Sequence, residues 1–552
     1  MRWYVPVAAS GLVLGAGACN AIFGVDGLTY DVGAGGTSPG VGGSGASTGG
    51  ALPTCSEGQT RTCYDGAPGT DGVGPCVSGI EACDGGTWSG LCEGQVVPEA
   101  ESCATTTDDD CDGNNCGDLL FATTFGLAGD QVVTQVVVDG GGAMIVAGTY
   151  DGELGLDPTV GPVGNPDGFV AIFDRVGVVT GLITLGGGPT YTNDVAVGPD
   201  GDLLVVGGYI NNLSVNLENQ LNGADGAYDG YLARITRAGD VVWVRRIGAG
   251  AADTVYTVDY HPTGGLYVGG TYGSGSLQVD GVDLGVSNAA NFDAFVIRFD
   301  DDGNPLWAQA YGNGDLDTVE GVASVPSGGV LLAMALSSGA ALGLPHQGNL
   351  DAATVRLDGN GEVLWARAFG SAGEDRFEGV LHHPEGFAVA VGTIGGDTAF
   401  DDETVPAAGV DAVAVAMDGT NGTVMWVTPI SSPGDDVGSG VDVDASGRIY
   451  VGGAYAGPAT LGRFALPDAT GRRSPFVARL LGDGSVDYAF GWLADSSPIG
   501  WSSIYGHVEL AVEDDGTLVT GGSFVTDIDF GGNVGVLEAT EATDAFLVRL
   551  AP

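Results

Sequence analysis

The sequence contains no lysine, and its 17 basic residues are all arginines, set against 70 Asp and Glu residues. The formal net charge of −53 excludes a nucleic-acid binder, because such a protein needs a basic face to displace counterions from phosphates. The absence of lysine excludes a Schiff base and the phosphate-binding lysine of a P-loop. An acidic shell of this kind indicates a solvated surface, and it also suits salty surroundings or calcium.

Signals for catalysis are scarce. The five histidines show no metal-binding spacing such as HExxH, and no GxSxG elbow with a credible partner set occurs. The segment 300–307 resembles the Asp-box of sialidase-type propellers with a spacing one residue too long, and 416–426 is similar to the repeat of quinone-cofactor dehydrogenases. Neither likeness assigns a cofactor residue, so no catalytic residue is predicted.

Long runs of helix-forming residues are also absent, while glycine is very abundant at 101 residues. This composition predicts many short strands joined by glycine turns.

The N-terminus has the pattern of an export signal. Arg2 supplies a positive start, a short apolar run follows, and small residues lead to Cys19. Ala16-Gly17-Ala18-Cys19 resembles a bacterial lipobox, with Ala16 where that family has Leu. The resemblance implies a signal peptide over 1–19, lipid on Cys19 and, because Asn20 follows, an outer-membrane or cell-surface location. The alternative is an ordinary secretory signal with a cysteine nearby.

Residues 20–54 predict a flexible Gly/Ser-rich tether.

Residues 55–117 form a cysteine-rich module too small and polar for a sizeable core. In an exported chain its eight cysteines predict four disulfides rather than zinc ligands, in any of 105 pairings. The cysteines are Cys55, Cys63, Cys76, Cys83, Cys92, Cys103, Cys111 and Cys116.

The same module offers a candidate metal site. CYDGAPGTDGVGPC (63–76) and DDDCDGNNC (108–116) resemble cysteine-rich modules of bacterial surface lipoproteins that carry a metal-binding motif. Asp108, Asp110, Asp112 and Asn114 alternate as calcium-loop ligands do, without the terminal Glu of an EF-hand. Ca²⁺ is therefore a possible cofactor, and no other is expected.

From residue 118 the chain repeats with a period near 60. Each unit holds an early strand pair, a strand opening with Asp, and a strand opening with an aromatic residue. The aspartates are Asp167, Asp229, Asp293, Asp351, Asp411 and Asp544, with Ser474 in the sixth copy; the aromatics are Trp243, Trp307, Trp365, Trp426 and Tyr488, with Gly181 in the first. Seven units of four strands predict an all-β fold, a seven-bladed β-propeller over 118–552.

The two ends of the repeat region fit each other. Residues 119–126 match a fourth strand, and the chain stops just after a third strand, 544–550. The N-terminal strand is therefore expected to complete the last blade and hide its edge. The pattern resembles the bacterial SBBP propeller repeat, which implies the fold and leaves the activity open.

Several recurrent residues could carry either structure or chemistry. An arginine five places after the blade Asp, in Arg234, Arg298, Arg356, Arg479 and Arg549, is expected to pair with carboxylates between blades. The blade aspartates are expected to accept backbone N–H bonds. Asp253, Asp317, Asp375 and Asp436 could ring a channel mouth and attract cations, with local turn capping as the alternative.

Two turns of each unit are short and uniform, whereas the segments 209–228 and 395–410 are long and variable. Long loops on a rigid scaffold are the usual place for recognition. We therefore predict a monomeric surface lipoprotein whose propeller binds a protein or glycan without catalysis. The alternatives are a secreted hydrolase or lyase acting on polysaccharide and a calcium-dependent structural protein.

Overall fold

The computed structural model describes residues 55–67, 70–98, 108, 111 and 118–552, the last range with gaps at 157–158, 223–225, 249, 289–291, 313–315, 338, 408, 495–507, 531–534 and 540–542. The expected signal with Cys19 and the tether lie outside these residues. The chain falls into two compact units, 1–60 with 82–90, and 61–81 with 91–552. Within the described part, no helix is long and apolar enough to cross a membrane.

The cysteine-rich segment forms a small three-stranded sheet of β1 (Thr60–Cys63), β2 (Gly79–Asp84) and β3 (Thr87–Trp88). Among its described residues three disulfides are present, Cys55–Cys83, Cys63–Cys92 and Cys76–Cys111. The prediction that bridges hold this segment is confirmed for these six cysteines. Cys103, Cys116, Asp110, Asp112 and Asn114 lie outside the described residues.

The rest of the described chain builds seven antiparallel sheets of four or more strands, numbered here in chain order, and three smaller ones. Sheet 1 holds β5 (Gln131–Val138), β6 (Met144–Tyr150), β7 (Asp167–Phe173) and β8 (Val179–Gly187); sheet 2 holds β9 (Thr190–Val197), β10 (Leu203–Tyr209), β13 (Asp229–Ile235) and β14 (Val241–Gly248). Sheet 3 holds β15 (Asp253–Tyr260), β16 (Leu266–Tyr272), β19 (Asp293–Phe299) and β20 (Pro305–Tyr311); sheet 4 holds β21 (Thr318–Ser324), β22 (Val330–Leu336), β23 (Asp351–Leu357) and β24 (Val363–Phe369).

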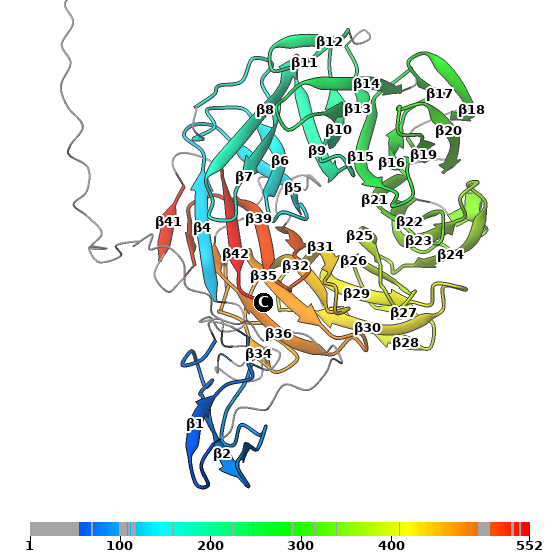
Figure 1. Cartoon of the computed structure of the whole chain (residues 1–552). Coiled ribbons are helices and arrows are strands. Elements are labelled where there is room, and N and C mark those ends of the chain that lie inside the picture. The colour runs from blue at the N-terminus through cyan, green and yellow to red at the C-terminus, as the bar shows by residue number, and fades with distance from the viewer. Residues whose placement is uncertain are drawn as a thin grey trace, which may run out of the picture. The chain divides into compact units, whose positions relative to one another are not determined.

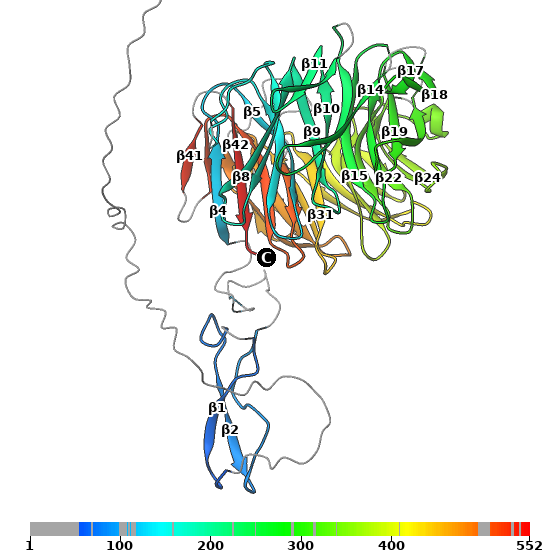
Figure 2. The same ribbon diagram turned by 45° about the horizontal axis from the view of Figure 1, so that its top comes forward.

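The remaining three sheets repeat this order. Sheet 5 holds β25 (Arg376–His382), β26 (Ala388–Ile394), β29 (Asp411–Met417) and β30 (Val424–Ile430); sheet 6 holds β31 (Val437–Val443), β32 (Ile449–Tyr455), β35 (Ser474–Leu480) and β36 (Val486–Gly491). Sheet 7 holds β38 (Val508–Val512), β39 (Leu518–Phe524), β42 (Asp544–Leu550) and β4 (Leu119–Phe125). As the sequence predicts, the early strand β4 pairs with the last strand β42 (Figure 2).

The sheets stand around a common centre, with their first strands innermost (Figure 1). In the described residues, seven apolar clusters each lie between two successive sheets, and one of them joins sheet 7 to sheet 1 through Phe125, Ala511, Phe169 and neighbours. The second strands are apolar and buried on both faces, as in β6 and β22. Burial on both faces explains why these strands read as continuous Val, Leu and Ala runs rather than as alternating patterns. The arrangement is that of a β-propeller.

The turn between first and second strands is the same in every sheet. Its first residue exchanges backbone hydrogen bonds with residues three and four places on, as His261 does with Gly264 and Gly265. A glycine with positive φ, such as Gly264 at +103°, closes each of these seven turns. The prediction of short and uniform first-to-second turns is therefore confirmed.

The long second-to-third segments mostly fold into extra hairpins. Those of β11 (Asn212–Val215) with β12 (Glu218–Asn222) and of β17 (Gly275–Val279) with β18 (Val282–Asn288) extend sheets 1 and 2 by pairing with β8 and β14. The hairpin of β40 (Asp527–Asp529) and β41 (Val536–Glu538) pairs with β37 (Leu493–Ala494) beyond sheet 6. Each of these covers the outer edge of the preceding sheet. Two shorter hairpins and a 3₁₀ turn complete the described elements: β27 (Thr398–Phe400), β28 (Glu403–Val405), β33 (Thr460–Leu461), β34 (Phe464–Ala465) and η1 (Gly339–Leu342).

Candidate functional site: an acid-lined central cavity

A cavity of about 590 Å³ lies where the innermost strands of all seven sheets meet. Each inner strand is the first strand of its sheet, so one backbone edge is left outside the sheet and faces this space. The inner strands also contact one another in a cycle that runs from β5 to β38 and back to β5. The cavity is thus built from equivalent positions of seven repeats.

A β-bulge occurs at the same place in six of the described inner strands. In β5 the residue without a partner on the second strand is Thr134, because Val133 faces Gly148 and Gln135 faces Ala147. The equivalent residues are Asn193, Tyr256, Glu320, Glu378 and Ser439. All six line the cavity. A bulge re-aims a side chain that strict alternation would place elsewhere.

Glycine on the second strand makes room for this bulge. A Cβ at Gly148 would stand 2.1 Å from the Val132 carbonyl oxygen, and one at Gly207 would stand 1.9 Å from that of Tyr191. Gly270, Gly392 and Gly453 meet the same inner-strand carbonyl in their sheets. The glycines in segments such as VVGGY and VGGTY are therefore a sequence signal of the bulge in five sheets, whereas Met334 takes this position in sheet 4.

Six carboxyl groups line the cavity: Asp194, Asp259, Glu320, Glu378, Asp442 and Glu509. Its described lining holds no arginine and no histidine. The carboxylates come from six of the seven inner strands, and only β5 contributes none. The cavity therefore has one sign of charge.

Burial changes how these acids titrate. It raises the pKa of Asp194 and of Asp442 to about 6, against the hydrogen bonds that they accept. It also raises the pKa of Asp259 and of Glu378. The pKa of Glu509 rises to about 8, first through burial and then through the negative charges of Asp194 and Glu378. Low exposure and like charge act together here.

The three lining aspartates also join neighbouring inner strands. Asp194 accepts a hydrogen bond from the backbone N–H of Val258 on β15 (2.8 Å). Asp259 accepts one from Ser324 (2.6 Å) and Asp442 one from Val512 (2.8 Å). These side chains replace the ladder bonds that separate sheets lack, so they hold the walls of the cavity in place.

Tyr256 and Glu378 are bulge residues of the cavity wall. Burial raises the pKa of Tyr256, and the nearby charges of Glu320 and Glu378 raise it further. Glu378 has one cationic neighbour, Arg376, with 3.9 Å between Oε1 and Nε. An aromatic ring beside carboxylates is a surface that attracts organic cations.

The predicted acidic ring lies elsewhere. Asp253, Asp317, Asp375 and Asp436 are buried, and none lines the cavity. Each accepts a hydrogen bond from the backbone N–H of the residue directly after the second strand of its sheet, at 2.7–3.0 Å. Turn capping accounts for these bonds. A cation-attracting ring at a channel mouth stays a prediction.

Of the candidate calcium ligands, only Asp108 belongs to the described residues. No group of three or more His, Cys, Asp or Glu side chains in the described part of the chain could hold a metal ion. Calcium binding by the module stays a prediction.

The recurrent tryptophans connect adjacent sheets. The indole N–H of Trp365 donates to the Gly419 carbonyl of sheet 5 (3.0 Å), and its ring covers Gly422. Trp243, Trp307 and Trp426 make the same contact with the next sheet. In sheet 7 the ring of Phe121 covers Gly177 of sheet 1. These residues are parts of the scaffold, as the repeat suggests.

The recurrent arginines divide into two groups. Arg234, Arg479 and Arg549 pair with carboxylates, the last with Glu513 at 2.6 Å, but each of these carboxylates belongs to the arginine's own sheet and not to the next one as predicted. Arg298 and Arg356 instead donate to backbone carbonyls, those of Gly359 and Gly328.

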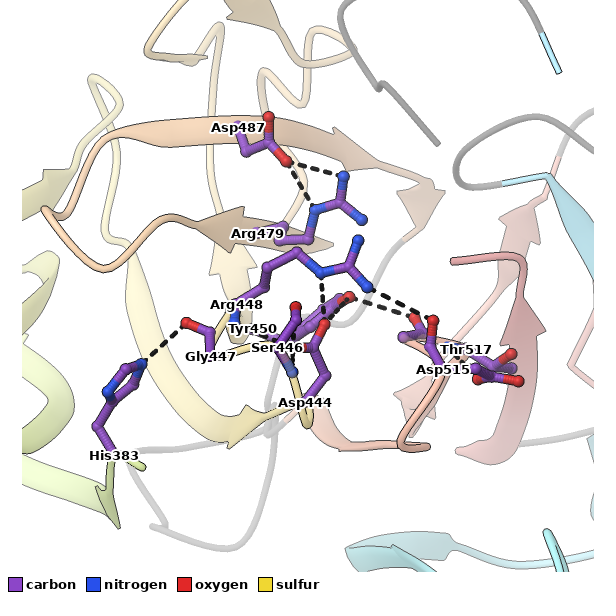
Figure 3. Close-up of polar contacts among 11 residues, drawn as sticks. His383, Asp444, Ser446, Gly447, Arg448, Tyr450, Arg479, Asp487, Asp515 and Thr517 are labelled. Atoms are coloured by element: carbon purple, nitrogen blue, oxygen red, sulfur yellow. Dashed lines mark hydrogen bonds and ion pairs between the residues drawn. The ribbon is translucent and has the colours of Figure 1, made fainter. Parts of the chain in front are cut away.

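The tight turns form a second polar network, between sheets 5, 6 and 7 (Figure 3). Arg448 donates to Asp444 within one turn (2.5 Å) and to the Asp515 carbonyl of the next (3.4 Å). The Nε2 atom of His383 lies 2.9 Å from the Gly447 carbonyl oxygen. These polar groups are occupied by contacts between turns, which makes this face structural.

Comparison with known proteins gives limited information. No family model matches the chain, and no curated protein does. Among solved structures it is similar to BamB from Moraxella catarrhalis (11% identity, 82% of this chain, 93% of that chain, TM-score 0.31). It is also similar to a quinohemoprotein alcohol dehydrogenase from Pseudomonas putida HK5 (12%, 78%, 76%, 0.37) and to the Pan2 WD40 domain of Neurospora crassa (10%, 60%, 93%, 0.29). The SBBP resemblance stays a prediction.

Proposed function

We propose that this chain is an exported, lipid-anchored binding scaffold, a closed seven-bladed propeller that captures a positively charged segment of a protein partner in its central cavity. The observation that carries the proposal is the cavity itself, lined by six carboxyl groups and, among the described residues, by no basic side chain. A cleft lined by one sign of charge between low-dielectric walls concentrates ligands of opposite charge.

Contacts between the last and first sheets support closure. Glu513 of the sheet 7 turn pairs with Arg175 of sheet 1 at 2.7 Å. The backbone N–H of Val133 donates to Ser523 Oγ of β39 (3.1 Å). The apolar cluster around Phe125 spans the same junction. A scaffold closed in this way keeps seven wall strands in fixed positions around the ligand.

Export is supported by the disulfides, since such bonds persist in oxidising compartments. The proposed lipid on Cys19 is tested by mass spectrometry of the mature N-terminus. A chain cut before Cys19 and carrying a diacyl group is expected. An unmodified thiol, or cleavage at another position, would contradict the anchor while leaving the cavity's role intact.

Binding is tested with matched peptides on the purified full-length chain. A basic peptide is expected to bind and an acidic peptide of the same length is not. Glu378→Gln should weaken binding of the basic peptide. Glu374→Gln should leave this binding unchanged, because Glu374 is the other acidic neighbour of Arg376 but lies outside the cavity lining. Equal effects of both variants would remove the cavity as the site. Binding of a protein or glycan to the face that carries the long second-to-third segments stays a prediction, and a glycan array would detect the glycan case.

A second candidate function is polysaccharide cleavage, by a hydrolase or a lyase reaction. The raised pKa of Glu509 keeps a proton on that acid near neutral pH, while the pKa of its neighbour Asp194 stays lower. Paired carboxyl groups of unequal pKa are what glycosidases use. Incubation with neutral and acidic glycans tests it. Product formed by the wild type and lost in Glu509→Gln would favour this function over binding alone.

A further inference from the structure

The cavity carboxylates fall into two tiers along the inner strands. Counted back from the first residue of the tight turn, Asp259 and Asp442 stand two places away. Asp194 and Glu509 stand four places away, and Glu320 and Glu378 five. At a rise of roughly 3.3 Å per residue, two or three residues correspond to about 7–10 Å between the tiers.

We propose that the cavity is a binding site for a linear polyamine, with ammonium groups at intervals along an aliphatic chain that lies parallel to the inner strands. This inference rests on the proposed function and names the ligand's chemistry. Its first ammonium group meets Glu320 and Glu378 of one tier, and a second meets the tier of Asp259 and Asp442. Short alkylene spacers separate ammonium groups over comparable distances.

The spacing argues against a compact cation. A divalent metal ion needs several oxygen ligands within about 2.1–2.6 Å. No set of three acidic, His or Cys side chains in the described chain meets that demand, although six carboxylates share one cavity. Charge spread over a long ligand matches charge spread over a long wall.

The non-acidic lining adds an aromatic ring and backbone groups. The valines one place on the turn side of Asp194 and its equivalents, such as Val195 and Val258, are instead buried in the apolar clusters between sheets. Tyr256 stands at the bulge position between Asn193 and Glu320 of the adjacent strands, and its ring can receive an ammonium group through a cation–π contact. Backbone edges of the inner strands add carbonyl acceptors.

Isothermal titration calorimetry of the purified full-length chain tests the inference. Spermine is the probe, with butylamine and CaCl₂ matched for ionic strength as controls. Spermine is expected to bind at one site per chain, and butylamine about tenfold or more weakly, because it reaches only one tier. CaCl₂ at that ionic strength should not displace spermine more than NaCl does.

Two variants locate the site. Glu378→Gln is expected to weaken the affinity for spermine about fivefold, and Glu374→Gln to change this affinity by less than about twofold. Both glutamates contact Arg376, but only Glu378 lines the cavity. Spermine binding that is absent, equal to that of butylamine, or equally weakened by both variants would overturn the inference. If the basic peptide binds and spermine does not, only the ligand assignment fails; if neither binds, the proposed function fails as well.

Discussion

The titration of Glu509 gives the sharpest test of the cavity electrostatics. Its pKa in the folded chain is about 8, against 4.5 for an ordinary glutamate. The folded state therefore keeps a proton that the unfolded state releases between these two values. The resulting cost to stability is absent below about pH 4.5, grows as pH rises, and is complete above about pH 8.

The size of the effect follows from linkage. At about 1.4 kcal/mol for each pKa unit, the raised pKa of Glu509 lowers the free energy of unfolding by about 2 kcal/mol at pH 6 and by about 5 kcal/mol at pH 9. Glu509→Gln removes the titrating group and keeps the size of the side chain. The variant should therefore gain about 3 kcal/mol relative to wild type between these two pH values.

Urea unfolding followed by tryptophan fluorescence measures this difference at both pH values. The same substitution at Glu218, an exposed glutamate of β12 outside the cavity lining, supplies the matched control. Asp194 and Glu378 raise the same pKa, so Asp194→Asn should reduce the effect at Glu509. A Glu509→Gln difference that is constant between the two pH values would refute the account of a buried, like-charged cavity.

Three other predictions concern the scaffold. Trp365→Ala should lower the free energy of unfolding by about 3–5 kcal/mol, because it removes a ring that is 7% exposed and that covers Gly422. Urea denaturation measures this loss, and a loss below about 1 kcal/mol would contradict the contact. Peptide mapping without reduction should recover the three described disulfides, and any other pairing of those cysteines would show a different module. A chain lacking residues 119–125 should lose cooperative unfolding, because sheet 7 loses its fourth strand; an unchanged transition would show that β4 is dispensable.

Much of the scaffold could be predicted because it repeats. Most copies place Asp, Arg and an aromatic residue at the same spacing, and the tryptophans make the same contact in successive sheets, as Trp307 and Trp365 do. The match of 119–126 to a fourth strand also located β4 correctly. Repetition turns weak local signals into a consistent one.

The site could not be predicted in the same way, because its residues do not repeat. Carboxylates occupy three different places on the inner strands, as Asp259, Asp194 and Glu320 show. The bulge then shifts side-chain alternation by one residue within each strand, so a period of two assigns part of the strand to the wrong side. The predicted ring of Asp253 and its equivalents followed a regular spacing, and regular spacing here marks capping.

The outer hairpin of β11 and β12 was missed for a local reason. The type I′ turn of a two-residue hairpin needs positive φ at both central positions, which usually means Asn-Gly or Asp-Gly. Between β11 and β12 these positions are Asn216 at +48° and Leu217 at +70°. Leu gives no turn signal, so the segment reads as an irregular loop suited to recognition. In the structure its strands instead cover the edge of sheet 1.

Salt dependence separates the cavity from the acidic surface around it. With a net charge of −53 the chain attracts any polycation, so binding alone does not identify a site. Attraction to exposed charges is screened beyond about 8 Å at physiological ionic strength, whereas charges between protein walls are screened much less. Spermine or peptide held in the cavity should therefore remain bound at salt concentrations that remove surface binding, and the salt-resistant fraction should be the one that Glu378→Gln lowers. If Glu378→Gln affected only the salt-sensitive fraction, the ligand would be on the surface and the cavity walls would be structural alone.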